Sequence, residues 1–459
     1  MHRPTREYVW GFEVLTREKP MLKKFLSFDN WTKMVVVYMW ASMFIGKAAA
    51  YLGLLIGALT LFSTRVLWDR WYRALTFRSD PMRGVGWALL VSILYGIAQV
   101  IYGVSFLGYS PLTALQILVF NLGPAYLFLG VWVGIRHPGA IRTYIRFMAW
   151  WMVIYTPIYF LFLQHLNLSL TGILPGTGLD LLGNPGSGTL PLLGLLTLEP
   201  QLARFWIPIV VLVLLTIANQ ERSDWLGLGV CLVIWGKLSG KLGRVFGILG
   251  CIATVLIIAA LIDLKLPPIP GRGGELSARG TIARMAGAIS PELAADVGGG
   301  RDNAQFYYGT VYWRQHWWAA IRSEVFKEPK TEIFGLGYGY PLAHLAGVDV
   351  EKQGTRSPHS VFYFTLAYSG FVGVAIFFWL EICILWLLWR VYEVSGETFG
   401  LMFAIYTLIG AFFGNVLETP QAAIPFYLLC GMALSPIFLR TAKVYDDEQA
   451  MPAHMAEFV

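Results

Sequence analysis

Charged residues are scarce in this sequence: they make up 14% of its 459 residues, whereas 56% are hydrophobic. A typical soluble domain carries about 25% charged residues, so the composition excludes an ordinary soluble protein. The long apolar runs also lack the alternation of polar and apolar residues that an outer-membrane barrel requires. The sequence therefore predicts an all-α integral membrane protein.

Cysteines and acidic motifs are scarce as well. The four cysteines all lie inside apolar runs, and their spacing matches neither a disulfide framework nor a zinc site. The polar loops offer no Asp-x-Asp-like pair that would hold a metal-bound nucleotide sugar. We therefore expect neither a metal nor another cofactor. We also expect no cleavable signal peptide, because about thirty mostly polar residues precede the first apolar run.

The net charge of +7 does not indicate a nucleic-acid partner. Lys and Arg cluster beside apolar runs, where they would face anionic membrane lipid and set the topology. Four segments hold most of them: residues 1–33, 65–83, 136–146 and 237–244. The positive-inside rule places all four segments in the cytoplasm.

Twelve apolar runs are candidate membrane spans. They are residues 34–46, 48–62, 87–107, 111–134, 145–165, 187–198, 205–219, 225–236, 245–263, 371–390, 398–416 and 421–440. Several are shorter than the roughly 20 residues of a full crossing, so 34–62 could be one helix and 187–198 could be re-entrant. Keeping the four basic segments on one side nevertheless requires about twelve transmembrane helices.

This topology divides the chain into five parts. They are a cytoplasmic segment (1–33), nine spans (34–263), a large extracytoplasmic loop (about 264–358), three spans (359–440) and a cytoplasmic tail (441–459). The loop contains an aromatic helix over 304–327, and 264–303 reads as a flexible approach because it is rich in Pro and Gly. Arg222, Arg314 and His359 all fall on the outer side.

His359 is the candidate general base. It follows Pro358, which suits the first turn of a helix, so His359 is expected at the outer end of a membrane helix. There the positive end of the helix dipole would favour the neutral imidazole that a base requires. A capping or interfacial histidine is the alternative.

Three arginines are candidate ligands for an anion: Arg222, Arg314 and Arg356. A planar guanidinium matches the oxygens of phosphate groups. Each also has a structural alternative. Arg314 could stack on its aromatic neighbours, Arg222 could pair with Glu221 or Asp224, and Arg356 could be a solvated loop charge.

Gly335, Gly337 and Gly339 lack the later third glycine and the βαβ unit of a dinucleotide fingerprint. We expect a tight turn that lets the backbone approach a ligand. Glu381 lies inside an apolar run, where an acid is a functional candidate by default. A structural pair with a polar neighbour is the favoured interpretation of Glu381.

The order of these pieces is more specific than any one of them. Along the chain come Arg222 in a short outer turn, Arg314-Gln-His-Trp317-Trp318 in the long loop, Phe334-Gly-Leu-Gly-Tyr-Gly339, His359, and Gly370-Phe-Val-Gly373. This set, within about 205–390, resembles the O-antigen ligase and polysaccharide polymerase superfamily of polytopic glycosyltransferases. Ser360 departs from the Asn that many relatives carry after the histidine.

The resemblance implies a metal-independent, inverting transferase in the bacterial inner membrane. Its donor would be a glycan on undecaprenyl pyrophosphate, and its acceptor a hydroxyl of another glycan or of a lipid-core sugar, at the outer face. His359 would deprotonate the acceptor, while Arg222 and Arg314, with Arg356, would bind the pyrophosphate. The alternatives are a transporter or flippase of lipid-linked glycan and a protein O-oligosaccharyltransferase. The sequence does not separate ligase from polymerase, nor identify the sugar or the oligomeric state.

Overall fold

The described part of the protein is almost entirely helical. The computed structural model describes residues 37, 65–163, 187–199, 206–219, 221–262, 265–266, 276–287, 290–298, 301–347 and 357–450. Within them, the only sheet is a short antiparallel ribbon of β1 (Lys265–Leu266) and β2 (Leu276–Ser277). The all-α prediction is therefore confirmed for this part of the chain. Most of the expected runs 34–46 and 48–62 and all of Arg356 lie outside it.

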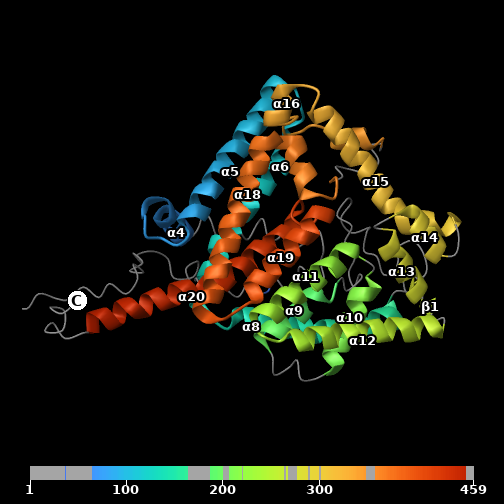
Figure 1. The fold of residues 1–459 in the computed structure, drawn as a ribbon. Helices are drawn as coiled ribbons and strands as arrows, with labels where there is room; N and C mark the ends of the chain where they lie inside the picture. The colour runs from blue at the N-terminus through green and yellow to red at the C-terminus, as the bar shows by residue number, and fades with distance from the viewer. Residues whose placement is uncertain are drawn as a thin grey trace, which may run out of the picture.

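The helices fall into three consecutive groups (Figure 1). The first contains α4 (Arg65–Thr76), α5 (Arg83–Ile101), α6 (Pro111–Leu122), α7 (Tyr126–Arg136) and α8 (Ala140–Leu161). The second contains α9 (Thr189–Leu198), α10 (Trp206–Ala218), α11 (Arg222–Leu238), α12 (Leu242–Leu261), α13 (Ala278–Ala286), α14 (Pro291–Gly298), α15 (Arg301–Val325) and α16 (Pro329–Phe334). The third contains α18 (Val361–Ser395), α19 (Phe399–Phe413) and α20 (Pro420–Ala450).

Four of the described helical segments are long and apolar enough to cross a membrane. They are Arg83–Phe106, Pro111–Arg136, Leu242–Leu261 and Val361–Ser395. Shorter apolar helices, including Ile207–Ile217 and Phe399–Phe413, lie among them. Only 6% of the most apolar stretch of Leu242–Leu261 is buried inside the protein, although apolar residues of this kind avoid water. These helices support an integral membrane protein.

The core is held by close contact between α7 and α20. A Cβ added to Gly130 would lie 2.2 Å from the Leu428 carbonyl oxygen, and one added to Gly431 would lie 2.1 Å from the Leu127 oxygen. Small residues let two helix backbones approach in this way, which replaces the hydrophobic driving force that lipid does not supply. The largest cluster of buried apolar side chains surrounds this pair.

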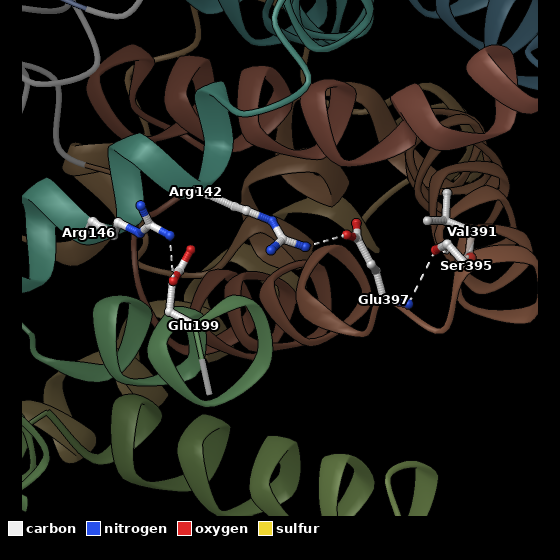
Figure 2. A network of polar contacts seen from close by, with 6 residues as sticks. All are labelled: Arg142, Arg146, Glu199, Val391, Ser395 and Glu397. Atoms are coloured by element: carbon white, nitrogen blue, oxygen red, sulfur yellow. Dashed lines mark hydrogen bonds and ion pairs between the residues drawn. The ribbon is translucent and has the colours of Figure 1, made fainter. Parts of the chain in front are cut away.

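Two ion pairs mark one end of the bundle (Figure 2). Arg142 of α8 lies 3.0 Å from Glu397, in the turn between α18 and α19. Arg146, one helical turn further along, lies 2.8 Å from Glu199, which follows α9. The two pairs therefore bring together three connections that the charge bias assigns to a common side.

Two further contacts extend this end. The Tyr392 hydroxyl donates a hydrogen bond to the Leu238 carbonyl at 3.2 Å, which joins the end of α11 to α18. The Arg70 guanidinium lies 4.2 Å from the ring centre of Phe438, which joins α4 to α20. The described basic segments thus meet at one end, as their shared charge predicts, whereas the site below lies at the other end.

This arrangement predicts a labelling pattern that depends on the side of the membrane. Glu292→Cys on α14 and Glu393→Cys near the end of α18 are both exposed, and each is tested after the four native cysteines are replaced. Because the two positions belong to opposite ends, an impermeant maleimide should label Glu292→Cys in intact cells. It should label Glu393→Cys only after permeabilisation. Equal labelling of both positions in intact cells would contradict the arrangement.

Candidate functional site

Three arginines from distant segments converge at the other end of the bundle. Arg222 begins α11, Arg314 lies in the middle of α15, and Arg284 lies in the last turn of α13. Burial, together with the like charges of Arg284 and Arg314, lowers the pKa of Arg222 to about 10. The structure therefore brings together two predicted arginines and adds a third.

Arg284 was missed because residues 264–303 were expected to be flexible. That expectation is wrong for the described residues 276–287 and 290–298, which form β2 and two helices. Ser277 caps α13 by accepting a hydrogen bond from the Gly280 amide at 3.0 Å. Ser290 caps α14 in the same way, and the proline that follows it suits the first turn. These two N-cap serines are the feature of the sequence from which both helices could have been predicted.

The position of Arg284 places its charge inside protein. The residue is only 6% exposed, and charged side chains are seldom so deeply buried. The site thus concentrates positive charge in a partly dehydrated place. Such a place attracts a compact, multiply charged anion.

The aromatic helix predicted over 304–327 is confirmed as α15, and it runs across this end of the molecule. At its start α15 follows α13 and α14, which lie near α12. At its end α15 leads to α16, which lies beside α5 and α18 (Figure 1). Trp317, Ile321 and Val325 form its buried face, each with no exposed surface. The neighbouring Trp318 donates a hydrogen bond to the Pro358 carbonyl at 2.8 Å. Trp318 thereby holds the segment that carries His359.

Arg314 ties α15 to the connection between α19 and α20. Its Nη1 donates a hydrogen bond to the carbonyl oxygen of Phe413, the last residue of α19, at 2.5 Å. This contact fixes the guanidinium across the end of the bundle. The aromatic residues beside Arg314 in the sequence are therefore not its only environment.

Glu418 lies in the same connection and was not predicted from the sequence. Both of its carboxylate oxygens are buried, and neither has a hydrogen-bond partner of standard geometry among the described residues. Burial raises the pKa of Glu418 well above its usual range, while the Ser360 amide and the Arg314 guanidinium act in the opposite direction. Glu418 therefore lies between Arg314 and the residue that follows His359.

His359 lies immediately outside the helix that it was expected to begin. Its φ of 55° is left-handed, and it is the only non-glycine residue with positive φ in the described part of the chain. A helix excludes this conformation, so Ser360 is the N-cap and α18 starts at Val361. The expected place in the first helical turn is wrong for this reason. Left-handed backbone outside glycine is uncommon, and strained positions of this kind cluster at functional sites.

The surroundings of His359 hold its ring at the surface of α15. The His359 amide donates a hydrogen bond to Ser357 Oγ at 3.0 Å. The imidazole meets the Trp313 ring edge-on, with 5.9 Å between the ring centres. Trp313 lies one residue before Arg314, so α15 positions both the histidine and the arginine.

The three predicted glycines pack against protein. Gly335 and Gly370 have positive φ, and Gly370 breaks α18. A Cβ added to Gly335 would lie 2.4 Å from the Ser369 amide nitrogen, and the Leu336 amide donates to the Ala367 carbonyl at 2.7 Å. Gly337 and Gly339 similarly lie against the side chains of residues 102–109. The close approach in the structure is to the broken helix α18, and an approach to a ligand stays a prediction.

Glu381 lies apart from the arginines. It is 2% exposed, and it accepts a hydrogen bond from the Tyr427 hydroxyl of α20 at 2.7 Å. It lies about five helical turns along α18 from Val361. This geometry agrees with the structural pair that the sequence favoured.

No group of three or more metal-ligating side chains occurs among the described residues. The chain matches no protein-family model, and no curated protein matches it significantly. A function must therefore be argued from the geometry of the arginines, Glu418 and His359.

The glycine contact generates a stability prediction. Gly335→Ala should lower the free energy of unfolding by about 3 kcal/mol or more, because the methyl group meets the α18 backbone and φ is 79°. Gly396→Ala is the matched control, since its φ is 72° but no atom lies near the added Cβ. Thermal unfolding in detergent should show a much larger loss for Gly335→Ala. Equal losses would contradict the packing role.

Proposed function

We propose that this protein is a membrane glycosyltransferase that moves a glycan from undecaprenyl pyrophosphate to an acceptor hydroxyl. The observation that carries the proposal is the convergence of Arg222, Arg284 and Arg314 at the end of the bundle where His359 lies. The motif order that resembles O-antigen ligases and polysaccharide polymerases supports the same reaction.

The arginines suit the pyrophosphate. This leaving group gathers negative charge as its bond to the sugar breaks, and fixed guanidinium groups stabilise that charge without reorganisation. Planar guanidinium forks also match pairs of phosphate oxygens, so they position the donor as well as binding it. In this proposal Arg222 and Arg314 hold the pyrophosphate, and Arg284 adds positive charge from within the protein.

His359 suits the acceptor. A neutral imidazole takes the proton from the acceptor hydroxyl as the oxygen attacks the anomeric carbon, opposite the departing pyrophosphate. Attack from that side inverts the anomeric centre. General-base catalysis of this kind contributes about 10²–10⁴-fold to the rate.

We infer that the site faces the outside of the bacterial inner membrane. The described basic segments meet at the opposite end, and the positive-inside rule assigns that end to the cytoplasm. The full arrangement is then about twelve spans with both termini inside. The loop of about 264–358 and the turn containing Glu418 are outside.

The proposal is tested by incubating purified protein with a lipid-linked oligosaccharide and acceptor glycans. The expected result is longer or joined glycan together with released undecaprenyl pyrophosphate. Movement of intact donor across proteoliposome membranes, with no release of undecaprenyl pyrophosphate, would identify a transporter and overturn the proposal.

Replacing the base should abolish turnover and leave the fold intact. Asn is the suitable replacement at His359, because Asn tolerates positive φ but is not a base. His359→Asn should lower kcat by about 10²-fold or more. Product formation at a near-normal rate would remove His359 from the proposed mechanism.

Replacing the planar guanidinium of an arginine by the single ammonium group of a lysine should weaken binding of the donor. Arg314→Lys should lower kcat/KM for the donor by about tenfold or more, because lysine loses the paired hydrogen bonds of a fork. Arg142→Lys, at the opposite end of the bundle, is the control and should retain normal kinetics. Equal effects of the two variants would argue against a pyrophosphate site at Arg314.

A further inference from the structure

Glu418 is a buried acid that the proposed reaction leaves unused. Its two oxygens are enclosed, and neither has a hydrogen-bond partner of standard geometry among the described residues. A fully ionised carboxylate in such a place costs several kcal/mol unless an opposite charge lies near. The opposite charge within reach is Arg314.

The same connection holds both partners of this interaction. Arg314 donates to the Phe413 carbonyl at the start of the connection, and Glu418 lies near its end. This hydrogen bond holds the guanidinium at the connection that contains Glu418. A bound pyrophosphate would be a second anion for a guanidinium that already faces a carboxylate.

Two anions that share one cation repel each other, and one of them can be neutralised by a proton. Of the two, the carboxyl accepts a proton more readily. A pyrophosphate that carries a lipid on one side and a sugar on the other is a diester, and it has no proton that titrates near neutral pH. Burial already favours the neutral form of Glu418.

We propose that Glu418 is a proton-linked counter-charge of Arg314: it balances the guanidinium in the empty site and takes up a proton when a lipid-linked pyrophosphate binds. This inference rests on the proposed function, because it assumes that the anion at Arg314 is a pyrophosphate. Binding of the donor then consumes a proton from solution, and no other reactant is needed.

The groups around Glu418 are consistent with this role. Arg314 faces it from α15, and the Ser360 amide faces it from the start of α18. Tyr368, further along α18, also lies within its electrostatic reach, and its hydroxyl donates to the Tyr340 carbonyl at 3.2 Å. His359, adjacent to Ser360, is a further group that can take up a proton. An experiment must separate it from Glu418.

The sign of the pH dependence follows from the charges. The bound anion opposes ionisation of Glu418, so the pKa of this carboxyl is higher in the complex than in the empty site. Donor affinity is therefore greatest at low pH. It falls as pH rises between the two pKa values, by at most about tenfold per pH unit for one proton.

The experiment measures binding of an undecaprenyl-pyrophosphate-linked sugar to detergent-solubilised protein between pH 6 and pH 9, without acceptor. Wild-type protein should lose affinity as pH rises. Glu418→Gln, which has the same shape but no charge, should show little pH dependence and bind about tenfold more tightly than wild type at high pH. Glu418→Asp should keep the pH dependence.

Two control variants isolate the effect. His359→Asn should keep the wild-type slope, which excludes the imidazole as its source. Glu381→Gln removes another acid with a buried carboxylate oxygen and should also follow wild type. Thermal unfolding of each variant verifies that it is folded.

Each result has a definite meaning. Weaker binding by Glu418→Gln at every pH, or a profile equal to that of wild type, would overturn the counter-charge role alone. A slope lost in His359→Asn but kept in Glu418→Gln would assign the proton to the histidine and overturn it as well. No binding by wild-type protein at any pH would overturn both this inference and the pyrophosphate site.

Discussion

Repulsion among like charges is the constraint on which the arginine-bearing end of this protein depends. Arg222, Arg284 and Arg314 come from three helices, and burial together with their mutual repulsion makes it costly to hold them together. Folding of the surrounding helices must supply that free energy. Glu418 gives this arrangement partial balance, and the proposed pyrophosphate would balance it further.

The rest of the architecture keeps these charges in place. Helix α15 crosses the end of the bundle and carries Arg314 on the same turn as Trp313, which contacts His359 (Figure 1). At one end α15 leads to α16 and the segment at Gly335, which packs against the break in α18. Trp318 of α15 donates a hydrogen bond to the Pro358 carbonyl and so holds the segment that contains His359.

The two ends of the bundle have different electrostatic character. At one end, arginines of α8 pair individually with carboxylates and remain partly exposed (Figure 2). The Arg142–Glu397 pair, in which both side chains are exposed, contributes about 0–1 kcal/mol, and neither pair needs a ligand. At the other end, Arg284 and Arg314 act on Arg222 as like charges, and burial lowers the pKa of Arg222. In the proposed function only this end binds the substrate, whereas a transporter needs a site reachable from both sides.

Much of this could be predicted from the sequence, because some signals are local. Hydropathy determined that the chain is helical and membrane-embedded, and charge bias placed Arg222, Arg314 and His359 on one side. The aromatic pattern of 304–327 also predicted α15, since periodicity depends only on neighbouring residues. Glu418 and Arg284 had no such signal. Each acquires its meaning from residues far away in the sequence, and a lone acid or arginine in a polar turn matches no motif.

The sequence by itself therefore determined that this is a helical membrane protein, and it identified residues available for chemistry. Only the tertiary structure decided which charges meet, because electrostatic interactions and burial depend on distance in space. It also decided the left-handed backbone at His359, which Pro358 had suggested would be helical. The packing of α15 and the broken helix α18 overrides that local preference. It converts scattered residues into a single charged site.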